Sequence, residues 1–371
     1  MAALDRPAVS AYLATVFGRP VELLALRPLK DAHEAAAKDP KGFGYGGPLE
    51  VECVVDGALH RLVISRTRPT QGFGHDYPAD RAWQALYAHH AYNDFPRHVR
   101  SVDVACIRDT GDIVSVANAG EFVQLVEKAE GTLYWLDLDR LLAAPLRPLD
   151  VDRARALGRF LAEAHAVKRD EPTLYARRIR ELVGHGECLM GILDSYPHPY
   201  PFLPPAACEA LERDAVSWRW RLRGRCARLA RTHGDFHPWN LLFQRGTEFS
   251  VLDRSRGEWG EPADDVAALA INYILFGLRK SAAAGEWGVA EPFTMLYRLF
   301  IDAYREASSD ADLGTVLPPF LAFRALVIAH PRWYPTLAPA TRRALIGGAQ
   351  SLMAATGCEL TAVGESFGGA A

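Results

Sequence analysis

Six runs within the first 128 residues have the apolar, partly alternating pattern that is typical of strands. The runs with this pattern lie at residues 21–27, 49–55, 60–67, 102–108, 112–117 and 121–128. Asp56-Gly57 separates the second and third runs and favours the two-residue turn of a β-hairpin. Helical spacing is confined here to residues 8–17 and 79–92, so we predict a strand-rich region with two helices.

The pattern changes near Gly131, where apolar positions begin to recur every three to four residues. The helical segments that this period predicts lie at residues 150–168, 172–232 and 264–355. A single hairpin is predicted among them, at residues 240–253. We therefore predict an α+β fold of two lobes, a small β-rich lobe at residues 1–130 and a larger helical lobe at residues 131–371.

Composition and charge indicate which partners the protein lacks. The net charge is −3, so no strong positive field is available to hold nucleic acid or an anionic membrane. The longest apolar run, residues 266–278, is shorter than the roughly 20 residues that cross a bilayer, so we predict a core helix and no membrane partner. The six cysteines form no C-x-x-C pair, and the first residues lack the apolar stretch of a signal peptide. We therefore expect a reducing, cytoplasmic compartment.

One segment concentrates polar side chains at the predicted hairpin. Residues 233–243 have the sequence HGDFHPWNLLF, and Asp253 follows the second apolar run of the hairpin. Asn240 and Asp253 are therefore expected side by side at the open end of an antiparallel pair, with Asp235 in the loop leading into that end. Hard oxygen ligands for a metal ion and a separate carboxylate near an acceptor hydroxyl are what a magnesium–nucleotide site requires.

The spacing of these residues resembles that of a known family. His233, Asp235 and Asn240 fit H-x-D-x-x-x-x-N, and Asp253 lies 18 residues beyond Asp235, as in the catalytic and metal loops of protein-kinase-like enzymes. The segment HGDFHPWN is similar to the H-G-D-x-H-x-x-N signature of the aminoglycoside-phosphotransferase and choline-kinase group. The segment GEPADDVA at residues 260–267 resembles the G-D-P-x-x-D-L-A motif of the same group.

The resemblance implies a protein-kinase-like fold with ATP bound between the two lobes. It implies that Asp235 orients and deprotonates a hydroxyl of a small-molecule acceptor, and that Asn240 and Asp253 hold Mg²⁺ on the phosphates. It also implies that Asp265 ties down the catalytic loop and that His233, the second candidate catalytic residue, braces it. We expect a small-molecule kinase, monomeric or homodimeric, whose acceptor is a sugar, an amino alcohol or an aminoglycoside-like molecule.

Some residues of the motif have other interpretations. Histidine can transfer protons, but bracing and packing roles are frequent for it, so we favour bracing for His233. Asp265 stands where a helix starts and could be only its N-cap. His233, Asp235 and His237 could also be the metal ligands of a hydrolase, although that hypothesis leaves the rest of the motif and the hairpin unexplained.

The predicted nucleotide-binding residues of the first lobe depart from the family pattern. The V-I-S-R run that matches V-A-I-K places Arg66 where the family has a lysine, and a solvated charge at a strand end is the alternative. The next helix offers Asp80 in place of a glutamate. Gly44 and Gly46 could cover phosphates with backbone N–H groups; a flexible connector and the glycines of residues 72–74 are the alternatives. A non-catalytic nucleotide-binding scaffold is therefore the main rival hypothesis.

Overall fold

The chain divides into two compact units, Met1–Val126 and Glu127–Ala371. The boundary expected between residues 130 and 131 falls just inside the second unit. The computed structural model describes residues 4–29, 46–69, 74–254 and 256–368.

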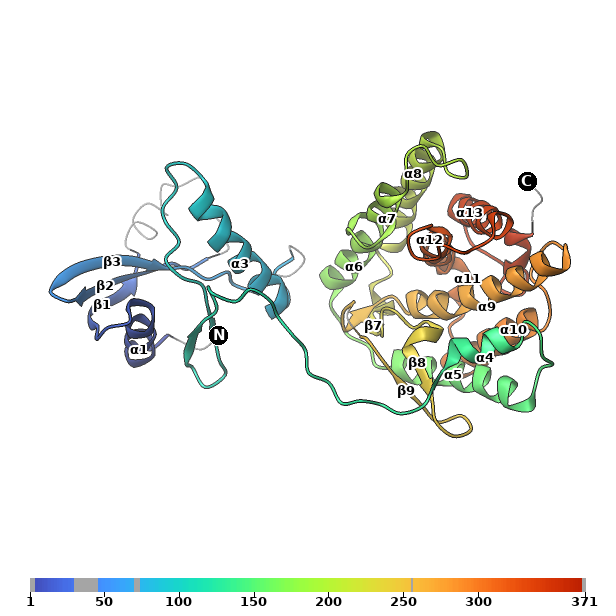
Figure 1. The fold of residues 1–371 in the computed structure, drawn as a ribbon, viewed down its shortest axis with the longest axis horizontal. Helices are drawn as coiled ribbons and strands as arrows, with labels where there is room; N and C mark the ends of the chain where they lie inside the picture. The colour runs from blue at the N-terminus through green and yellow to red at the C-terminus, as the bar shows by residue number, and fades with distance from the viewer. Residues whose placement is uncertain (1–3, 30–45, 70–73, 255, 369–371) are drawn as a thin grey trace. The chain divides into compact units, whose positions relative to one another are not determined.

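The first unit contains a three-stranded antiparallel sheet with the strand order β1-β2-β3 (Figure 1). Its strands are β1 (Glu22–Pro28), β2 (Leu49–Val55) and β3 (Ala58–Ile64). The hairpin predicted at Asp56-Gly57 is confirmed, because these two residues join β2 to β3 with φ angles of 49° and 80°. Positive φ at both central residues is what a type I′ turn requires.

Helix α1 (Arg6–Phe17) supplies the other half of the core of this unit. The side chains buried in this core are Val9, Leu13, Val51, Cys53 and Val55. The three from β2 are alternate residues, as the period of two in the sequence predicts. Each fully buried apolar side chain of this kind stabilises the fold by roughly 1.5–3 kcal/mol relative to an exposed one.

The rest of the first unit confirms one helix and two strands of the sequence prediction. Helix α3 spans Pro78–Asp94, and the strands β4 (Ala105–Ile107) and β5 (Ile113–Ser115) pair as an antiparallel hairpin. The strand predicted at residues 121–128 is wrong, because these residues take no regular secondary structure. Their apolar residues favour a strand, but a strand also needs a partner, and no described strand pairs with this segment.

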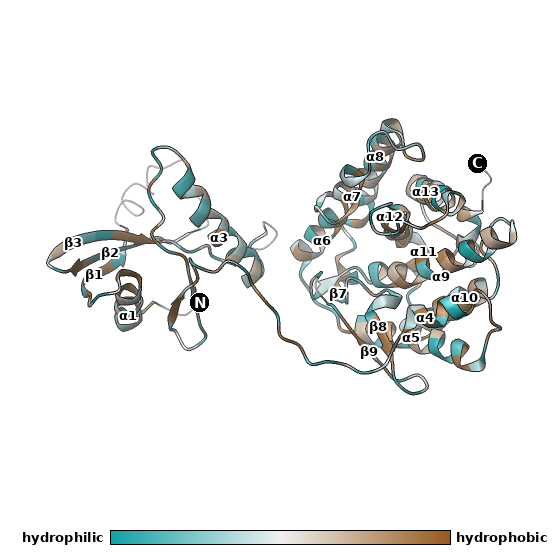
Figure 2. Ribbon diagram, in the orientation of Figure 1, coloured by the Kyte–Doolittle hydropathy of each residue, from teal (hydrophilic) through white to brown (hydrophobic). Residues whose placement is uncertain are grey.

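The second unit is mainly helical, as the sequence predicts. Its helices are α4 (Tyr134–Arg140), α5 (Pro148–Ala166), α6 (Pro172–Gly184), α7 (Leu189–Ser195), α8 (Pro205–Leu222), α9 (Pro262–Ala284), α10 (Phe293–Ser308), α11 (Leu313–Val316), α12 (Pro318–Ala329) and α13 (Pro339–Ala354). Helix α10 packs along α5 and α9, and α12 packs on α9 and α13. Hydrophilic and hydrophobic residues both occur along α10, as expected for a helix with one buried face (Figure 2).

Helix α9 forms the centre of this unit and confirms the predicted core helix. Its residues from Val266 to Leu278 are all buried. Among the described residues, α9 is the one helix long and apolar enough to span a membrane, and 78% of its most apolar stretch is buried within the fold. Such burial is typical of a core helix in a globular unit.

Short strands in the second unit hold the loop that carries the HGDFHPWN motif. Strand β8 (Leu241–Phe243) pairs on one side with β6 (Thr132–Leu133) and on the other with β9 (Phe249–Val251), which confirms the hairpin predicted at residues 240–253. Strand β7 (Ala230–Arg231) pairs with β10 (Trp259–Gly260). The segment from residue 232 to residue 240 therefore starts at one small sheet and ends at another, which fixes both of its ends.

Candidate active site

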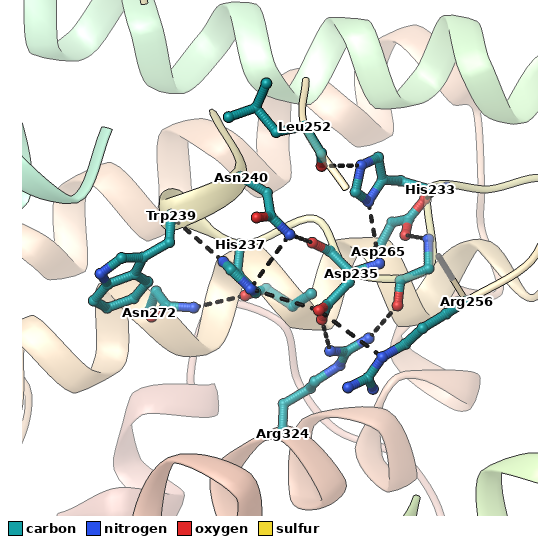
Figure 3. Close-up of polar contacts among 12 residues, drawn as sticks. His233, Asp235, His237, Trp239, Asn240, Leu252, Arg256, Asp265, Asn272 and Arg324 are labelled. Carbon is teal, nitrogen blue, oxygen red and sulfur yellow. Dashed lines mark hydrogen bonds and ion pairs between the residues drawn. The ribbon is translucent and has the colours of Figure 1, made fainter. Parts of the chain in front are cut away.

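The loop between β7 and β8 is held by a carboxylate from α9. Asp265 is fully buried, and its two oxygens accept hydrogen bonds from the backbone N–H groups of His233 and Gly234, both at 2.7 Å (Figure 3). Its Oδ2 also lies 3.1 Å from Nε2 of His165 on α5. Burial alone would raise the pKa of Asp265, but the hydrogen bond and charge of His165, together with the loop N–H bonds, hold it below the ordinary value.

The alternative role of Asp265 as a helix N-cap is wrong. Helix α9 begins at Pro262, and Glu261 is its N-cap, with its side chain accepting from the N–H of Ala263. Asp265 stands in the first turn, one residue after Asp264, and turns toward the loop instead of toward its own helix end. The loop also needs Gly234, whose φ is 87° and where a Cβ would lie 2.9 Å from the Cβ of Arg256.

His233 braces the end of the hairpin. Its Nε2 donates to the carbonyl oxygen of Leu252 at 2.9 Å, and its Nδ1 accepts from the N–H of Asp235 at 3.2 Å. Burial lowers its pKa, which favours the neutral ring that these two bonds require. Both ring nitrogens are therefore engaged within the loop, which leaves neither of them for a reacting group or for a transition metal. The geometry does not fit the metal-hydrolase hypothesis, and no group of three or more His, Cys, Asp or Glu side chains placed for a metal occurs among the described residues.

The carboxylate of Asp235 in this loop contacts two arginines and a histidine. Its Oδ1 accepts from Nη1 of Arg324 at 2.5 Å. Its Oδ2 lies 3.5 Å from Nε2 of His237 and 3.8 Å from Nε of Arg256. Burial alone would raise the pKa of Asp235, but the 3.5 Å contact with His237 and the charges of Arg324 and Arg256 hold it well below its usual range. The side chain is therefore an anion at neutral pH.

Asn240 is the last residue of the 3₁₀ turn Pro238–Asn240, and its side-chain amide uses only the nitrogen for hydrogen bonding to described residues. Its Nδ2 donates to the backbone carbonyl of Asp235 at 3.0 Å, which orients the side chain, while Oδ1 has no partner among the described residues. The backbone carbonyl of Asn240 accepts from the N–H of Leu252 at 2.8 Å. That bond continues the β8–β9 pairing by one step and brings Asn240 beside the residue that precedes Asp253.

Asp253 lies two residues beyond the end of β9, so it follows the strand that it was expected to close. Its φ is 54°, a left-handed conformation that Asp adopts more readily than most residues. The side chain is exposed and has no hydrogen-bond or ion-pair partner among the described residues. Asn240 Oδ1 and the Asp253 carboxylate are hard oxygen donors, so their chemistry fits Mg²⁺.

Arg324 is the residue of this site that the sequence analysis missed. It lies on α12, 89 residues after Asp235, and its side chain is only 6% exposed. Besides Asp235, it donates to the carbonyl of Gly234 at 2.7 Å and to Oδ1 of Asp264 at 2.7 Å. The available signal was a single charged residue in an otherwise apolar helix, because a buried arginine needs acceptors supplied by another part of the fold.

Aromatic side chains line the second unit next to this loop. Trp239 stacks on Trp135 with ring centroids 6.0 Å apart, and Tyr334 meets Trp239 edge to face, also at 6.0 Å. Burial, with the negative charge of Asp235, raises the pKa of Tyr334 to about 12. The loop at residues 232–240 therefore places the Asp235 carboxylate in a chain of contacts that runs through His237 to Trp239 and Tyr334.

The candidates in the first unit are placed only in part. Gly44 lies outside the described residues. Gly46 forms an isolated antiparallel bridge with Thr67, next to Arg66, which lies two residues beyond the end of β3. The carboxylate of Asp80 accepts from the N–H of Tyr77 at 2.9 Å, at the start of α3. The roles of Arg66, Gly46 and Asp80 in nucleotide binding stay predictions.

Comparisons with known proteins agree with the motif. The model of the phosphotransferase enzyme family (APH) matches residues 66–297, which is more than half of the chain. No curated protein matches the chain in sequence.

The solved structures that are similar to this chain have low identity and low TM-scores. A glucosamine kinase is 18% identical over 90% of this chain and 94% of its own, with a TM-score of 0.39. A macrolide 2'-phosphotransferase from Brachybacterium faecium is 15% identical over 92% and 97%, with a TM-score of 0.32. An ethanolamine kinase from Plasmodium vivax is 11% identical over 87% and 78%, with a TM-score of 0.33. On the match of the family model, the chain belongs to the phosphotransferase enzyme family and has its kinase-like fold.

Proposed function

We propose that this protein transfers the γ-phosphate of ATP to a hydroxyl group of a small molecule. The observation that carries the proposal is the loop and hairpin at residues 233–253. There Oδ2 of the anionic Asp235 has no donor nearer than 3.5 Å, and Asn240 Oδ1 and the Asp253 carboxylate have no partner among the described residues. Phosphoryl transfer depends mainly on positioning and on electrostatic stabilisation, and this arrangement supplies both.

The residues of the loop have distinct tasks in the proposed reaction. Asp235 accepts a hydrogen bond from the acceptor hydroxyl, orients it, and takes its proton as the acceptor oxygen bonds to the γ-phosphorus. The bond from the γ-phosphorus to the oxygen that bridges it to the β-phosphate breaks, and its electron pair leaves on ADP. Asn240 and Asp253 would hold Mg²⁺, which supplies charge neutralisation on the phosphates. Asp265 and His233 keep the loop rigid enough for this geometry.

The nucleotide-binding part of the proposal rests on the first unit. Arg66 would supply a cation for the phosphates, Asp80 would be its partner, and the backbone around Gly44 and Gly46 would cover the phosphates. Arginine in the place of the family's lysine is the observation that favours the rival function, nucleotide binding without turnover. The rival predicts ATP binding with no phosphorylated product across all acceptors.

The acceptor is proposed to be a hydroxyl compound with at most one positive charge, such as a neutral sugar or an amino alcohol. The aromatic faces of Trp239 and Tyr334 near Asp235 fit the apolar face of a sugar ring, and the arginines 256 and 324 near the same carboxylate disfavour a polycation such as an aminoglycoside. The three acceptor classes differ in charge, so a panel of acceptors separates them.

The test is a panel of sugars, amino alcohols and aminoglycosides incubated with ATP and Mg²⁺. ADP release is followed by a coupled assay, and the product is identified by the mass of one added phosphate. We expect acceptor-dependent ADP release with wild-type protein and its loss with Asp235→Asn. Tight ATP binding without product from any acceptor would favour the scaffold function.

A further inference from the structure

Arg324 holds one defined oxygen of the proposed catalytic base. Its Nη1 donates to Asp235 Oδ1 at 2.5 Å, and the hydrogen bond is drawn in Figure 3 from the helix that carries Arg324 to the loop. Charge-assisted bonds of this kind are short and roughly twice as strong as neutral ones. The carboxylate of Asp235 is thereby fixed at Oδ1, while Oδ2 keeps only the longer approaches of His237 at 3.5 Å and Arg256 at 3.8 Å.

The guanidinium group is itself fixed on its other edge. Nη2 donates to the Gly234 carbonyl at 2.7 Å, and Nε and Nη2 donate to Oδ1 of Asp264 at 3.1 and 2.7 Å. The side chain of Arg324 is 6% exposed, and that of Asp264 is 28% exposed. Arg324 therefore binds the backbone of the loop, the first turn of α9 and the base at once. A planar guanidinium group has several N–H donors in fixed directions and can make all of these hydrogen bonds. A lysine ammonium group cannot reproduce their geometry.

We propose that Arg324 is a positioning residue of the phosphotransfer, with Asp264 as the residue that orients it. This proposal rests on the proposed function. Arg324 touches neither acceptor nor ATP; it sets the rotation of the Asp235 carboxylate so that Oδ2 faces the acceptor hydroxyl. The proton of that hydroxyl passes to Oδ2 while the acceptor oxygen bonds to the γ-phosphorus and ADP departs with the electron pair of the broken bond. Two oxygens of one carboxylate thus have two tasks, anchoring and proton acceptance.

A structural role alone would give a different result from a positioning role. A buried arginine that only stabilises the fold affects how much protein is folded, but not the turnover of each folded molecule. Loss of a positioning residue lowers kcat while the affinity for ATP stays the same. A displacement of the reacting groups by about 1 Å can lower the rate by ~10²-fold. Arg228 offers the matched control, since it also bridges two carboxylates, Asp310 and Glu261, inside the same unit.

The experiment compares Arg324→Lys with Arg228→Lys in the whole chain, using the acceptor found in the panel. For Arg324→Lys we expect kcat per folded molecule to fall by roughly 10–10²-fold, with the KM values for ATP and acceptor changed by less than about threefold. For Arg228→Lys we expect a lower melting temperature and a kcat within about twofold of wild type. Asp264→Ala, which keeps Arg324 but frees one edge of its guanidinium, should lower kcat by roughly threefold to tenfold.

A double-mutant cycle then tests the route of the effect. If Arg324 acts through the Asp235 carboxylate, Arg324→Lys should cost little further turnover in an Asp235→Asn background. An equal fold-loss in both backgrounds would overturn the proposal, and so would a wild-type kcat in Arg324→Lys or a loss confined to KM. A wild-type protein that phosphorylates no acceptor overturns the proposed function, and this inference with it, before any variant is compared. Failure of the proposed function is therefore seen in the wild-type protein, and failure of this inference is seen in the Arg324 variants.

Discussion

Two arginines of the second unit, Arg228 and Arg324, with side chains 13% and 6% exposed, bridge pairs of carboxylates, and the two clusters differ in which carboxylate oxygens they leave without a close donor. In the closed cluster, Arg228 donates to both oxygens of Asp310 at 2.7 Å and through Nε to Glu261 at 2.8 Å. The hydroxyl of Tyr175 donates to the second Glu261 oxygen at 2.7 Å. In the open cluster, Arg324 engages Oδ1 of Asp235 at 2.5 Å, while Oδ2 has no donor nearer than 3.5 Å.

The difference shows how one kind of interaction serves two purposes. A carboxylate whose two oxygens are both held by close protein donors is less available to a ligand, and in the closed cluster Glu261 also serves as the N-cap of α9. A carboxylate that is held by one oxygen only is both immobile and reactive. The same contrast extends to the hairpin end, where Asn240 Oδ1 and the Asp253 carboxylate have no partner among the described residues. Oxygen atoms left free in an otherwise satisfied region mark the site.

The largest expected effect is at Asp253. Asp253→Ala should abolish magnesium-dependent turnover and leave the helical circular dichroism unchanged, because the side chain is exposed and bonds to no described residue. Turnover is measured against Mg²⁺ concentration. Asp253→Asn is the matched control for the backbone, because Asn tolerates the φ of 54° and keeps one oxygen ligand. Turnover near the wild-type level in Asp253→Ala would show that the metal assignment is wrong.

The next effect concerns the open oxygen of Asp235. Asp235→Asn keeps the shape and the bond from Arg324 but removes the charge that accepts a proton. Turnover should fall by about 10² or more, the usual scale for the loss of a general base, with little change in ATP affinity. Melting temperature, ATP affinity and turnover are measured on one preparation. A weakened ATP affinity with full turnover per folded molecule would show that Asp235, like the carboxylates of the closed cluster, has a structural role.

The closed cluster should respond in the opposite way. Asp310→Ala removes two charge-assisted hydrogen bonds of Arg228, which keeps its pairing with Glu261, and hydrogen bonds to charged groups are typically worth about 2 kcal/mol. We expect the free energy of unfolding, measured by urea titration, to fall by roughly this amount. Turnover per folded molecule should stay near the wild-type value. A large loss of kcat at full stability would break the comparison, because the closed cluster would then take part in the reaction.

The smallest effect is the dependence of stability on pH. Burial alone would raise the pKa of Asp310, but the hydrogen bond and charge of Arg228 hold it below the ordinary value. A depressed carboxylate pKa contributes stability above the unfolded pKa, about 3.9, and this contribution is lost as pH falls through the lower folded value. Urea titrations between neutral and acid pH should therefore show less acid destabilisation in Asp310→Asn than in wild type. An identical pH dependence in both proteins would contradict the assignment.

Local patterns in the sequence predicted most of the elements, and non-local pairing explains the misses. The Asp56-Gly57 turn and the hairpin at residues 240–253 are encoded by adjacent residues, so both were predictable. The strand expected at residues 121–128 requires a pairing partner, which composition alone does not supply. The extent of β3, which ends two residues before Arg66, was likewise set by pairing with β2 instead of by the apolar run.

For the site, the sequence by itself determined the types of residue and their order along one loop. His233, Asp235 and Asn240 lie within eight residues, and Asp253 follows the same hairpin two residues beyond β9, so local chain geometry keeps all four on one loop and hairpin. Only the tertiary structure decided which oxygens remain free. Arg324 reaches Asp235 from 89 residues away, and its hydrogen bond depends on how α12 packs on α9. Packing of distant helices leaves no spacing signature in a sequence, because it is decided by the shape and burial of whole surfaces.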